Sequence, residues 1–170
     1  MLPVAILAGG LATRLRPITE TIPKALVEVA GEPFIARQLN YLSEQGVSKV
    51  VLCVGYLGDM IRDVVGSGER FGLKVSYSED GPTLLGTGGA LKAALPLLGR
   101  HFFVLYGDSY LPVNFSAVQT AYEQNKRQSL MTVLKNQDRW DKSNVLFVLN
   151  LVVFFSSIPI KKINDIRIGQ

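Results

Sequence analysis

The sequence contains one cysteine and one histidine, and no apolar run long enough to span a membrane. A single cysteine excludes a disulfide within the chain. Cys53 lies in the apolar run 50–54, which is typical of a small buried side chain rather than a nucleophile. His101 has no catalytic partner in view, so we expect it to be structural. Because Met1 leads directly into an apolar segment with no signal peptide, the expected compartment is the reducing cytoplasm.

The sequence also lacks the basic pattern that is typical of nucleic-acid binding. Its net charge is +4, yet residues 1–125 carry ten Lys and Arg against eleven Asp and Glu. Residues 126–170 carry eight against three, so the basic excess belongs to the last quarter of the chain. No basic stripe is interleaved with aromatic residues, and we therefore expect no nucleic-acid partner.

What the sequence does contain is an alternation of apolar segments and helical patterns. A chain of 170 residues, nearly half of them apolar, can form one α/β domain with a substantial core. We expect strands over 4–7, 49–54, 73–77, 101–106 and 130–134. The expected helices cover 34–45, 59–65, 90–98 and 112–125, the last of them capped by Asn114 or Ser116.

The first apolar segment leads directly into a glycine pair and a cluster of cations. Gly9 and Gly10 let the backbone turn sharply, and the amides of such a turn can bind phosphate oxygens. Arg14, Arg16 and Lys24 follow in the same stretch; arginine grips phosphate bidentately, and lysine adds a mobile charge. This order of residues indicates a phosphate site.

Neither a Walker A loop nor a dinucleotide fingerprint fits the spacing of residues 9–14. The stretch resembles instead the loop L-A-G-G-x-G-T-R-L-x-P-L-T, followed by P-K-x-L, of the sugar-1-phosphate nucleotidyltransferases. The chain departs from this pattern at Ala12, where the family has glycine. If the position requires a positive φ, Ala12 carries a penalty of roughly 1 kcal/mol; if it is right-handed, alanine stabilises the turn.

The resemblance implies an α/β fold with a Rossmann-like, mostly parallel sheet and helices on both faces, of the nucleotide-diphospho-sugar transferase type. In such sheets ligands bind beyond the carboxyl ends of the strands, so the loops after the first, third and fourth strands should meet. The match runs from about Val4 to Phe147. We therefore expect a nucleotide-binding half of the domain over 1–147 and a divergent apolar and basic tail over 148–170.

Further site residues follow from the resemblance. The glycine-rich segment 84–90 matches the element that lies against the nucleotide base, and Glu79 upstream is the candidate reader of the base edge. A carboxylate accepts the N–H donors of guanine, so guanine is favoured over uracil. Asp108 matches the family's Mg²⁺ ligand. The candidate catalytic residues are Arg14 and Lys24, and the candidate nucleotide-binding residues are Leu7, Ala8, Gly9, Gly10, Thr13, Glu79, Gly86, Thr87 and Gly88.

The implied reaction is transfer of a nucleotidyl group from an NTP, with GTP favoured over UTP, to a sugar 1-phosphate, with Mg²⁺ as cofactor. The products are an NDP-sugar and pyrophosphate. Segments 84–90 and 106–110 most resemble the heptose-1-phosphate guanylyltransferase and muramate-1-phosphate uridylyltransferase types, followed by mannose-1-phosphate guanylyltransferases. Beyond Phe147 the family places sugar contacts and a second metal-binding Asp. The alternative is thus a truncated or frameshifted homologue that binds nucleotide without turnover.

Three interpretations of the apolar stretch 145–158 stay open. A membrane anchor would be short, because a span needs about 20 apolar residues and Asn150 interrupts the run. The stretch could also form a genuine strand, or it could be out of register with the family.

Overall fold

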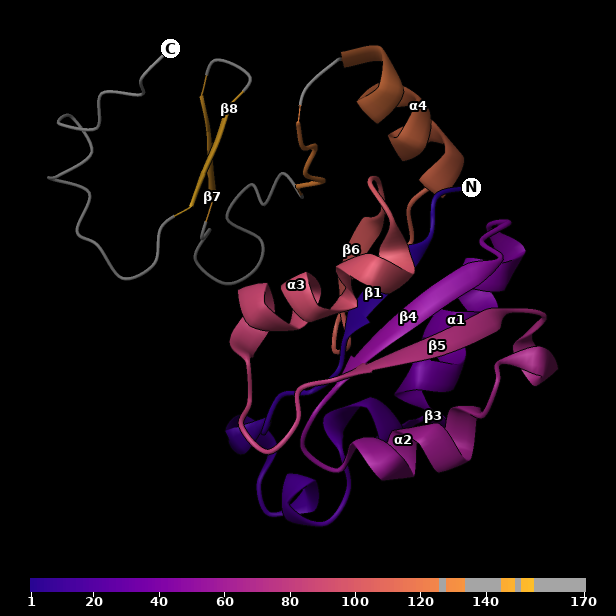
Figure 1. The fold of residues 1–170 in the computed structure, drawn as a ribbon, viewed down its shortest axis with the longest axis vertical. Helices are drawn as coiled ribbons and strands as arrows, with labels where there is room; N and C mark the ends of the chain where they lie inside the picture. The colour runs from indigo at the N-terminus through magenta and orange to yellow at the C-terminus, as the bar shows by residue number, and fades with distance from the viewer. Residues whose placement is uncertain (126–127, 134–144, 149–150, 155–170) are drawn as a thin grey trace, which may run out of the picture. The chain divides into compact units, whose positions relative to one another are not determined.

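The structure is a computed structural model that describes residues 1–125, 128–133, 145–148 and 151–154. The chain divides into two units, residues 1–123 and 124–170, and each is described by itself. The first unit is built on a parallel sheet of β1 (Val4–Leu7), β4 (Lys49–Val54), β5 (Lys74–Glu79) and β6 (Phe103–Tyr106). The strand order is β5-β4-β1-β6 (Figure 1). The predicted parallel α/β sheet is confirmed.

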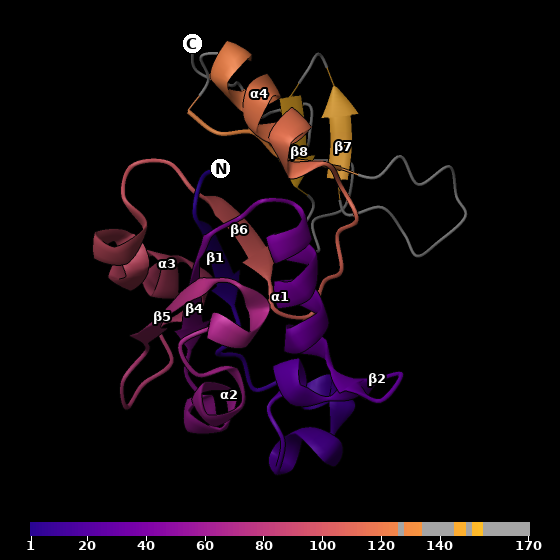
Figure 2. The same ribbon diagram turned by 90° about the vertical axis from the view of Figure 1, so that its right-hand side faces the viewer.

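Helices cover both faces of this sheet, as predicted. The helices α1 (Phe34–Glu44) and α2 (Gly58–Val65) pack with alternate residues of β1 and β4 in one core cluster. The helix α3 (Gly86–Leu98) packs on the opposite face against Ala5, Val51 and Cys53. Figure 2 shows the sheet between α3 on one side and α1 on the other.

The spacing of apolar residues explains why these helices pack as they do. Ile35, Leu39 and Leu42 recur at helical spacing on α1 and are fully buried, which is the pattern of a helix with one apolar face. On α3 the buried positions are Ala90, Ala94 and Leu98, so small side chains let the helix lie close to the sheet.

The remaining helix of this region, α4 (Phe115–Asn125), begins after the predicted cap. Asn114 Oδ1 accepts a hydrogen bond of 2.9 Å from the backbone N–H of Ala117, which confirms the first of the two predicted caps. Phe115, at its first position, joins the core cluster of α1 and α2.

Short elements connect β1 to α1. Three 3₁₀ turns cover Thr13–Leu15, Ile18–Glu20 and Lys24–Leu26. They are followed by the antiparallel pair β2 (Glu28–Val29) and β3 (Glu32–Pro33). A fourth 3₁₀ turn, Glu69–Phe71, precedes β5.

Several predicted boundaries are wrong, and the reasons are local. The strand β5 continues through Glu79 because Ser78 and Glu79 extend the parallel ladder with Cys53 and Val54, although their side chains are polar. The helix α3 begins at Gly86 rather than at residue 90, so most of the glycine-rich segment is its first turn. The strand β6 begins at Phe103, and His101 precedes it.

The predicted fifth strand is also wrong where the structure describes it, because residues 130–133 are not in a strand. Leu134 and the predicted polar loop 135–143 lie outside the described residues. In the second unit, β7 (Val145–Val148) and β8 (Leu151–Phe154) form an antiparallel pair, which favours the strand interpretation of this stretch. The predicted boundary between residues 147 and 148 stays a prediction. In the part of the chain described, no helix is long and apolar enough to cross a membrane.

The order of the strands determines where a ligand can bind. The chain runs outward from β1 through β4 to β5, then returns through α3 to place β6 on the other side of β1. The direction of winding therefore reverses at β1, and in sheets of this kind the crevice beyond the carboxyl ends of the strands at such a point is the usual ligand site.

Candidate active site at the carboxyl ends of the strands

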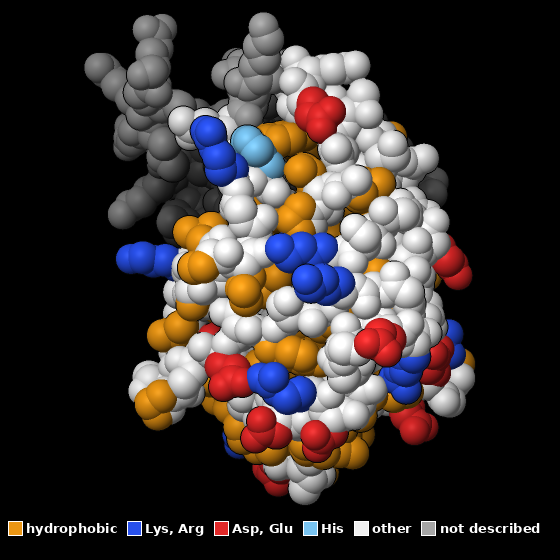
Figure 3. Space-filling view, turned by 45° about the vertical axis from the view of Figure 1, so that its right-hand side comes forward, with side chains coloured by type: hydrophobic (Ala, Val, Ile, Leu, Met, Phe, Trp, Pro, Cys, Tyr) orange, Lys and Arg blue, Asp and Glu red, His pale blue; other side chains and the backbone are white. Residues whose placement is uncertain are grey.

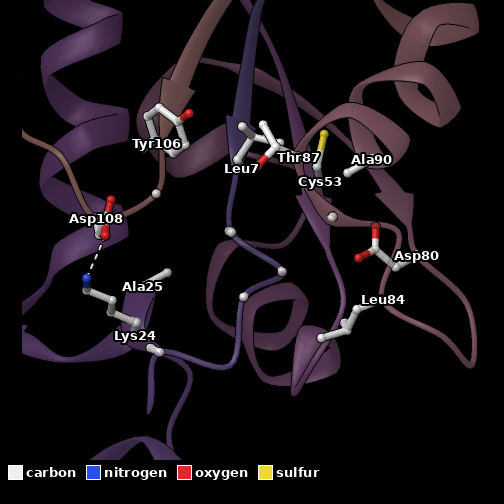
Figure 4. Close-up of a pocket in the computed structure, with 16 residues that line it drawn as sticks. Leu7, Lys24, Ala25, Cys53, Asp80, Leu84, Thr87, Ala90, Tyr106 and Asp108 are labelled. Carbon is white, nitrogen blue, oxygen red and sulfur yellow. Dashed lines mark hydrogen bonds and ion pairs between the residues drawn. The ribbon is translucent and has the colours of Figure 1, made fainter. Parts of the chain in front are cut away.

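A cavity of about 290 Å³ opens at this edge of the sheet (Figure 4). As predicted, the segments that follow β1, β5 and β6 meet there, and the end of β4 contributes Cys53. Its lining consists of Leu7, Ala8, Gly9, Gly10, Ala12, Lys24, Ala25, Cys53, Asp80, Leu84, Gly86, Thr87, Ala90, Tyr106, Gly107 and Asp108.

The two glycines after β1 serve different purposes. A Cβ at Gly9 would lie 2.9 Å from the backbone N of Gly55 and 3.2 Å from the carbonyl carbon of Val54, so the turn packs directly on the exit of β4. A Cβ at Gly10 would meet nothing within 4 Å. Gly9 is therefore required by packing, whereas Gly10 leaves open space beside the backbone in which a ligand can approach.

Lys24 and Asp108 form an ion pair within the cavity. Lys24 Nζ lies 2.5 Å from Asp108 Oδ2, and the two side chains are 37% and 43% exposed. The hydrogen bond from Lys24 lowers the pKa of Asp108, although its partial burial acts in the opposite direction. Segments that are 84 residues apart in the sequence thus place a cation and an anion side by side.

A tight turn after β6 carries Asp108. The backbone N–H of Ser109 donates to the carbonyl of Tyr106 at 3.2 Å, and that of Gly107 donates to the carbonyl of Leu7 at 2.9 Å. A Cβ at Gly107 would lie 2.7 Å from the Leu7 carbonyl oxygen, so only glycine lets the turn lie against β1. This packing explains the Gly-Asp order at the end of the strand.

The opposite side of the cavity carries a second carboxylate, which the sequence analysis missed. Asp80 follows β5 directly, and its Oδ2 accepts a hydrogen bond of 3.2 Å from the backbone N–H of Leu85. Figure 4 shows Asp80 and Leu84 on one side of the cavity, with the Lys24–Asp108 pair on the other side. Successive side chains of a strand point to opposite faces of the sheet, so Glu79 and Asp80 are expected to point in different directions. This alternation was the signal in the sequence that could have distinguished the two carboxylates.

Four predicted site residues do not line the cavity. Glu79 forms an ion pair with Arg62 of α2, whose guanidinium lies 4.3 Å from the centre of the Tyr77 ring. Arg14 lies in the exposed 3₁₀ turn Thr13–Leu15 and is not among the residues that line the cavity. The roles proposed for Glu79, Arg14, Thr13 and Gly88 stay predictions.

The loop that carries Arg14 contains a left-handed residue. Ala12 has φ 47° and ψ 44°, which is the left-handed conformation. Of the two alternatives for this position, the strained one is therefore observed. Thr19, which is buried, donates from Oγ1 to the Ala12 carbonyl at 2.9 Å, and the Tyr56 hydroxyl donates to the Glu20 carbonyl at 2.9 Å. The first bond closes the loop between Ala12 and Thr19, and the second ties its far end to Tyr56, in the segment after β4.

Cys53 lines the cavity as a buried thiol with a raised pKa. The side chain is 1% exposed, and burial, together with the nearby charge of Asp80, raises the pKa of its thiol to about 11. A thiol with this pKa is protonated at neutral pH and is a poor nucleophile. The prediction that Cys53 is a small buried side chain is confirmed.

A metal at this site would have few protein ligands among the described residues. No group of three or more His, Cys, Asp and Glu side chains gathers there in a way that could hold an ion. Asp108 is the carboxylate next to the phosphate-type turn, and one carboxylate is enough for Mg²⁺ where substrate phosphates and water supply the other ligands. The donor set therefore fits a magnesium ion that arrives together with a nucleotide.

The charges on one face of the molecule (Figure 3) are mixed in sign. On the face shown in Figure 3, Lys and Arg side chains lie among Asp and Glu side chains rather than in a continuous strip. This arrangement agrees with the near-neutral balance of residues 1–125.

The fold and the cavity define a Rossmann-like α/β domain with a glycine turn and a Lys–Asp pair at the carboxyl ends of its strands. A family model described as nucleotidyl transferase matches residues 4–143. The chain belongs to this family. The resemblance to sugar-1-phosphate nucleotidyltransferases is confirmed by its curated relatives.

Two relatives and one solved structure illustrate the similarity. The N-acetylmuramate alpha-1-phosphate uridylyltransferase of Neisseria meningitidis serogroup B is 41% identical over 118 residues, which cover 68% of this chain and 51% of the relative. The D-glycero-alpha-D-manno-heptose 1-phosphate guanylyltransferase of Campylobacter jejuni is 32% identical over 160 residues, covering 92% of this chain and 69% of the relative. HddC from Yersinia pseudotuberculosis complexed with GMP-PN is 37% identical, with a TM-score of 0.64, and the match covers 71% of this chain and 54% of that one.

The chain is short beside these proteins. It spans about half the length of the Neisseria relative and of the Yersinia structure, at 51% and 54%.

Proposed function

We propose that this chain binds a nucleoside triphosphate in the cavity and transfers its nucleotidyl group to a sugar 1-phosphate. The observation that carries the proposal is the shared cavity of the Gly9–Gly10 turn and the Lys24–Asp108 pair. A turn that leaves open space beside its backbone, next to a lysine and a carboxylate, suits a phosphate chain and its metal ion.

The two sides of the cavity suit the two ends of a nucleotide. The phosphates would lie over Gly10 beside Lys24, and the base would lie against the first turn of α3, where Gly86 and Thr87 line the wall. A Cβ at Gly86 would meet nothing within 4 Å, which leaves room for a flat ring. Arg14 would approach the triphosphate from the loop that Ala12 and Thr19 hold.

The reaction needs positioning and neutralisation of charge more than proton transfer. An oxygen of the sugar 1-phosphate forms a bond to the α-phosphorus, the bond from the α-phosphorus to the bridging oxygen of the β-phosphate breaks, and pyrophosphate leaves. The attacking oxygen is already an anion, so no general base is required. Lys24 would stabilise the charge that develops on the reacting phosphates.

We propose Mg²⁺ as the cofactor, held by Asp108 and by the phosphates. When bound, the ion supplies positive charge next to the leaving pyrophosphate. Asp108 Oδ2 is 2.5 Å from Lys24 Nζ, so the ion and the lysine would share one carboxylate or exchange places on it.

GTP is the favoured nucleotide. Asp80 lines the cavity beside Leu84 (Figure 4), on the side where the base would lie, and its carboxylate can accept guanine N–H donors; Glu79 is next to it in the sequence. The Campylobacter relative is named a guanylyltransferase and the Neisseria relative a uridylyltransferase, so UTP is the competing substrate. The proposed compartment is the cytoplasm, where nucleoside triphosphates are available.

Calorimetry with GTP and UTP, combined with an assay of pyrophosphate release in the presence of sugar 1-phosphates, tests this function. We expect Lys24→Ala and Asp108→Ala to lower turnover about 100-fold or more, as the loss of a transition-state contact does. The matched control is Glu32→Ala, which breaks the exposed pair of Glu32 with Arg37 outside the cavity. Absence of nucleotide binding would refute the proposal; binding without pyrophosphate release would favour the nucleotide-binding fragment.

A further inference from the structure

A buried amide lies behind the turn that carries Asp108. Gln38 projects from α1, is 3% exposed, and belongs to a helix face whose other buried members are apolar: Ile35, Ala36, Leu39 and Leu42. A primary amide in such surroundings is stabilising only where its donors and acceptors are paired. Where its hydrogen bonds lead therefore shows what the residue is for.

Both bonds of the Gln38 amide lead to the Asp108 turn. Nε2 donates to the carbonyl of Tyr106 at 3.1 Å and to the carbonyl of Ser109 at 2.7 Å. Tyr106 and Ser109 are the first and last residues of the turn, which their own hydrogen bond of 3.2 Å closes. The two N–H donors of one side chain thus hold both ends of the turn on which Asp108 is one of the two central residues.

The other end of the amide is left unpaired. In the part of the chain described, Gln38 Oε1 is buried and has no hydrogen-bond partner. A buried acceptor without a partner is unfavourable, and a methionine or leucine at this place would avoid it. Buried polar atoms are normally hydrogen-bonded, and exceptions in natural proteins are expected at functional or strained sites. The position therefore keeps glutamine for its two N–H donors, in spite of the unpaired oxygen.

The donors of Gln38 act on the geometry of the ion pair. Lys24 reaches Asp108 from a different segment of the chain. The ion pair therefore forms only if the turn holds the Asp108 carboxylate in a fixed position. The glycine contact of the turn with Leu7 fixes its position along β1, and Gln38 fixes its ends. Gln38 does not itself line the cavity, and it bonds to the backbone of the turn rather than to Asp108 or Lys24.

We propose that Gln38 is the positioning residue that fixes the Asp108 carboxylate for the metal and for Lys24. The proposal rests on the proposed function for its kinetic consequences, but its structural consequence can be measured without turnover. If the amide is removed, the turn keeps its sequence and its glycine contact but loses the support for its two ends.

Two variants remove the donors in different ways. Gln38→Met keeps much of the volume without any polar group. Gln38→Glu keeps the length and shape, but it offers at most one O–H donor, when burial keeps its carboxyl protonated, in place of two N–H donors. The matched control is Tyr41→Phe, on the same helix, which removes a single hydrogen bond of 3.0 Å to the carbonyl of Val113. Val113 lies in the segment that follows the turn, so this bond joins α1 to the same stretch of chain without involving the turn itself.

The kinetic test separates positioning from general loss of structure. We expect both Gln38 variants to lower kcat and to raise the Mg²⁺ concentration for half-maximal rate, each by about 10- to 100-fold, with KM for the nucleotide changed less than about threefold. Tyr41→Phe should stay within about twofold of the unsubstituted protein in all three quantities. Gln38 variants that match Tyr41→Phe would overturn the proposal.

Amide hydrogen exchange tests the same proposal without catalysis. The Ser109 amide closes the turn, so we expect its exchange to be at least about 10-fold faster in both Gln38 variants and unchanged in Tyr41→Phe. Equal protection in all three proteins would overturn the proposal. If the unsubstituted chain releases no pyrophosphate, the proposed function fails, and the exchange rates alone decide the role of Gln38.

Discussion

The pair of glycines after β1 offers a test in which neighbouring substitutions should have opposite effects. In Gly9→Ala the new methyl group would lie 2.9 Å from the backbone N of Gly55, and neither backbone can move without disturbing β1 or β4. In Gly10→Ala the methyl group would meet nothing within 4 Å and would project into open space. The first change therefore alters the folded protein, and the second alters only what can bind.

The sizes of the two effects follow from these contacts. Overpacking against backbone at Gly9 should lower the free energy of unfolding by about 1 to 3 kcal/mol. For a domain of this size this corresponds to a fall of about 3 to 10 °C in Tm. Gly10→Ala should leave stability unchanged or raise it by up to about 1 kcal/mol, because alanine restricts the unfolded chain.

Affinity for GTP should fall more in Gly10→Ala than in Gly9→Ala, the reverse of the order expected for stability. The methyl group of Gly10→Ala would occupy space that the phosphates need next to the backbone amide, so affinity for GTP should fall at least about 10-fold, or about 1.4 kcal/mol. Urea denaturation measures the stability of each variant, and calorimetry with GTP and Mg²⁺ measures affinity. A Gly10→Ala protein that is destabilised but binds GTP normally would refute the reasoning, as would a Gly9→Ala protein of unchanged stability.

Three further predictions concern Ala12, Asp108 and Cys53. Ala12→Gly should raise the free energy of unfolding by at most about 1 kcal/mol in urea denaturation, because strain is relieved while the unfolded chain gains freedom; a clear loss of stability would contradict it. Asp108 has a folded pKa below its ordinary value of 3.8, so its ion pair stabilises the fold above that value, and this contribution is lost as pH falls through the lowered pKa. The stability difference between the unsubstituted protein and Asp108→Asn should be constant from about pH 5 to 7 and shrink below about pH 4; a difference that grows towards low pH would contradict this sign. Cys53, with a thiol pKa of about 11, should react with iodoacetamide at about pH 8 roughly 100-fold more slowly than an exposed cysteine, and more slowly still with GTP bound; rapid alkylation would mean that the thiol is not buried.

Much of the fold could be predicted from the sequence, because in the central strands and in α1 the local sequence patterns agree with the tertiary structure. The buried strands β1 and β4 are continuous apolar runs, and the apolar positions of α1 recur at helical spacing. The turns after β1 and β6 were recognisable because close contact between backbones requires glycine at Gly9 and Gly107.

The errors have a common physical origin in contacts that the local sequence does not contain. The strand β5 continues to Glu79 because β4 offers the backbone partners for it, whatever the polarity of the side chains. The same extension directs Glu79 to Arg62 and leaves Asp80 as the carboxylate that lines the cavity opposite Asp108 (Figure 4), while the role predicted for Glu79 stays a prediction. Gln38 was passed over because, in the sequence alone, a glutamine on an amphipathic helix is indistinguishable from a solvated one.

The central claim is that a nucleoside triphosphate and its metal ion lie between the turn after β1 and the turn after β6. Replacing Mg²⁺ by paramagnetic Mn²⁺ in the presence of GTP, and recording the broadening of backbone amide signals by NMR, tests it most directly. The account predicts the strongest broadening at Gly10, Lys24 and Asp108, and weaker broadening at Thr87 across the cavity. Broadening centred elsewhere, with the Gly10 and Asp108 signals unaffected, would contradict it.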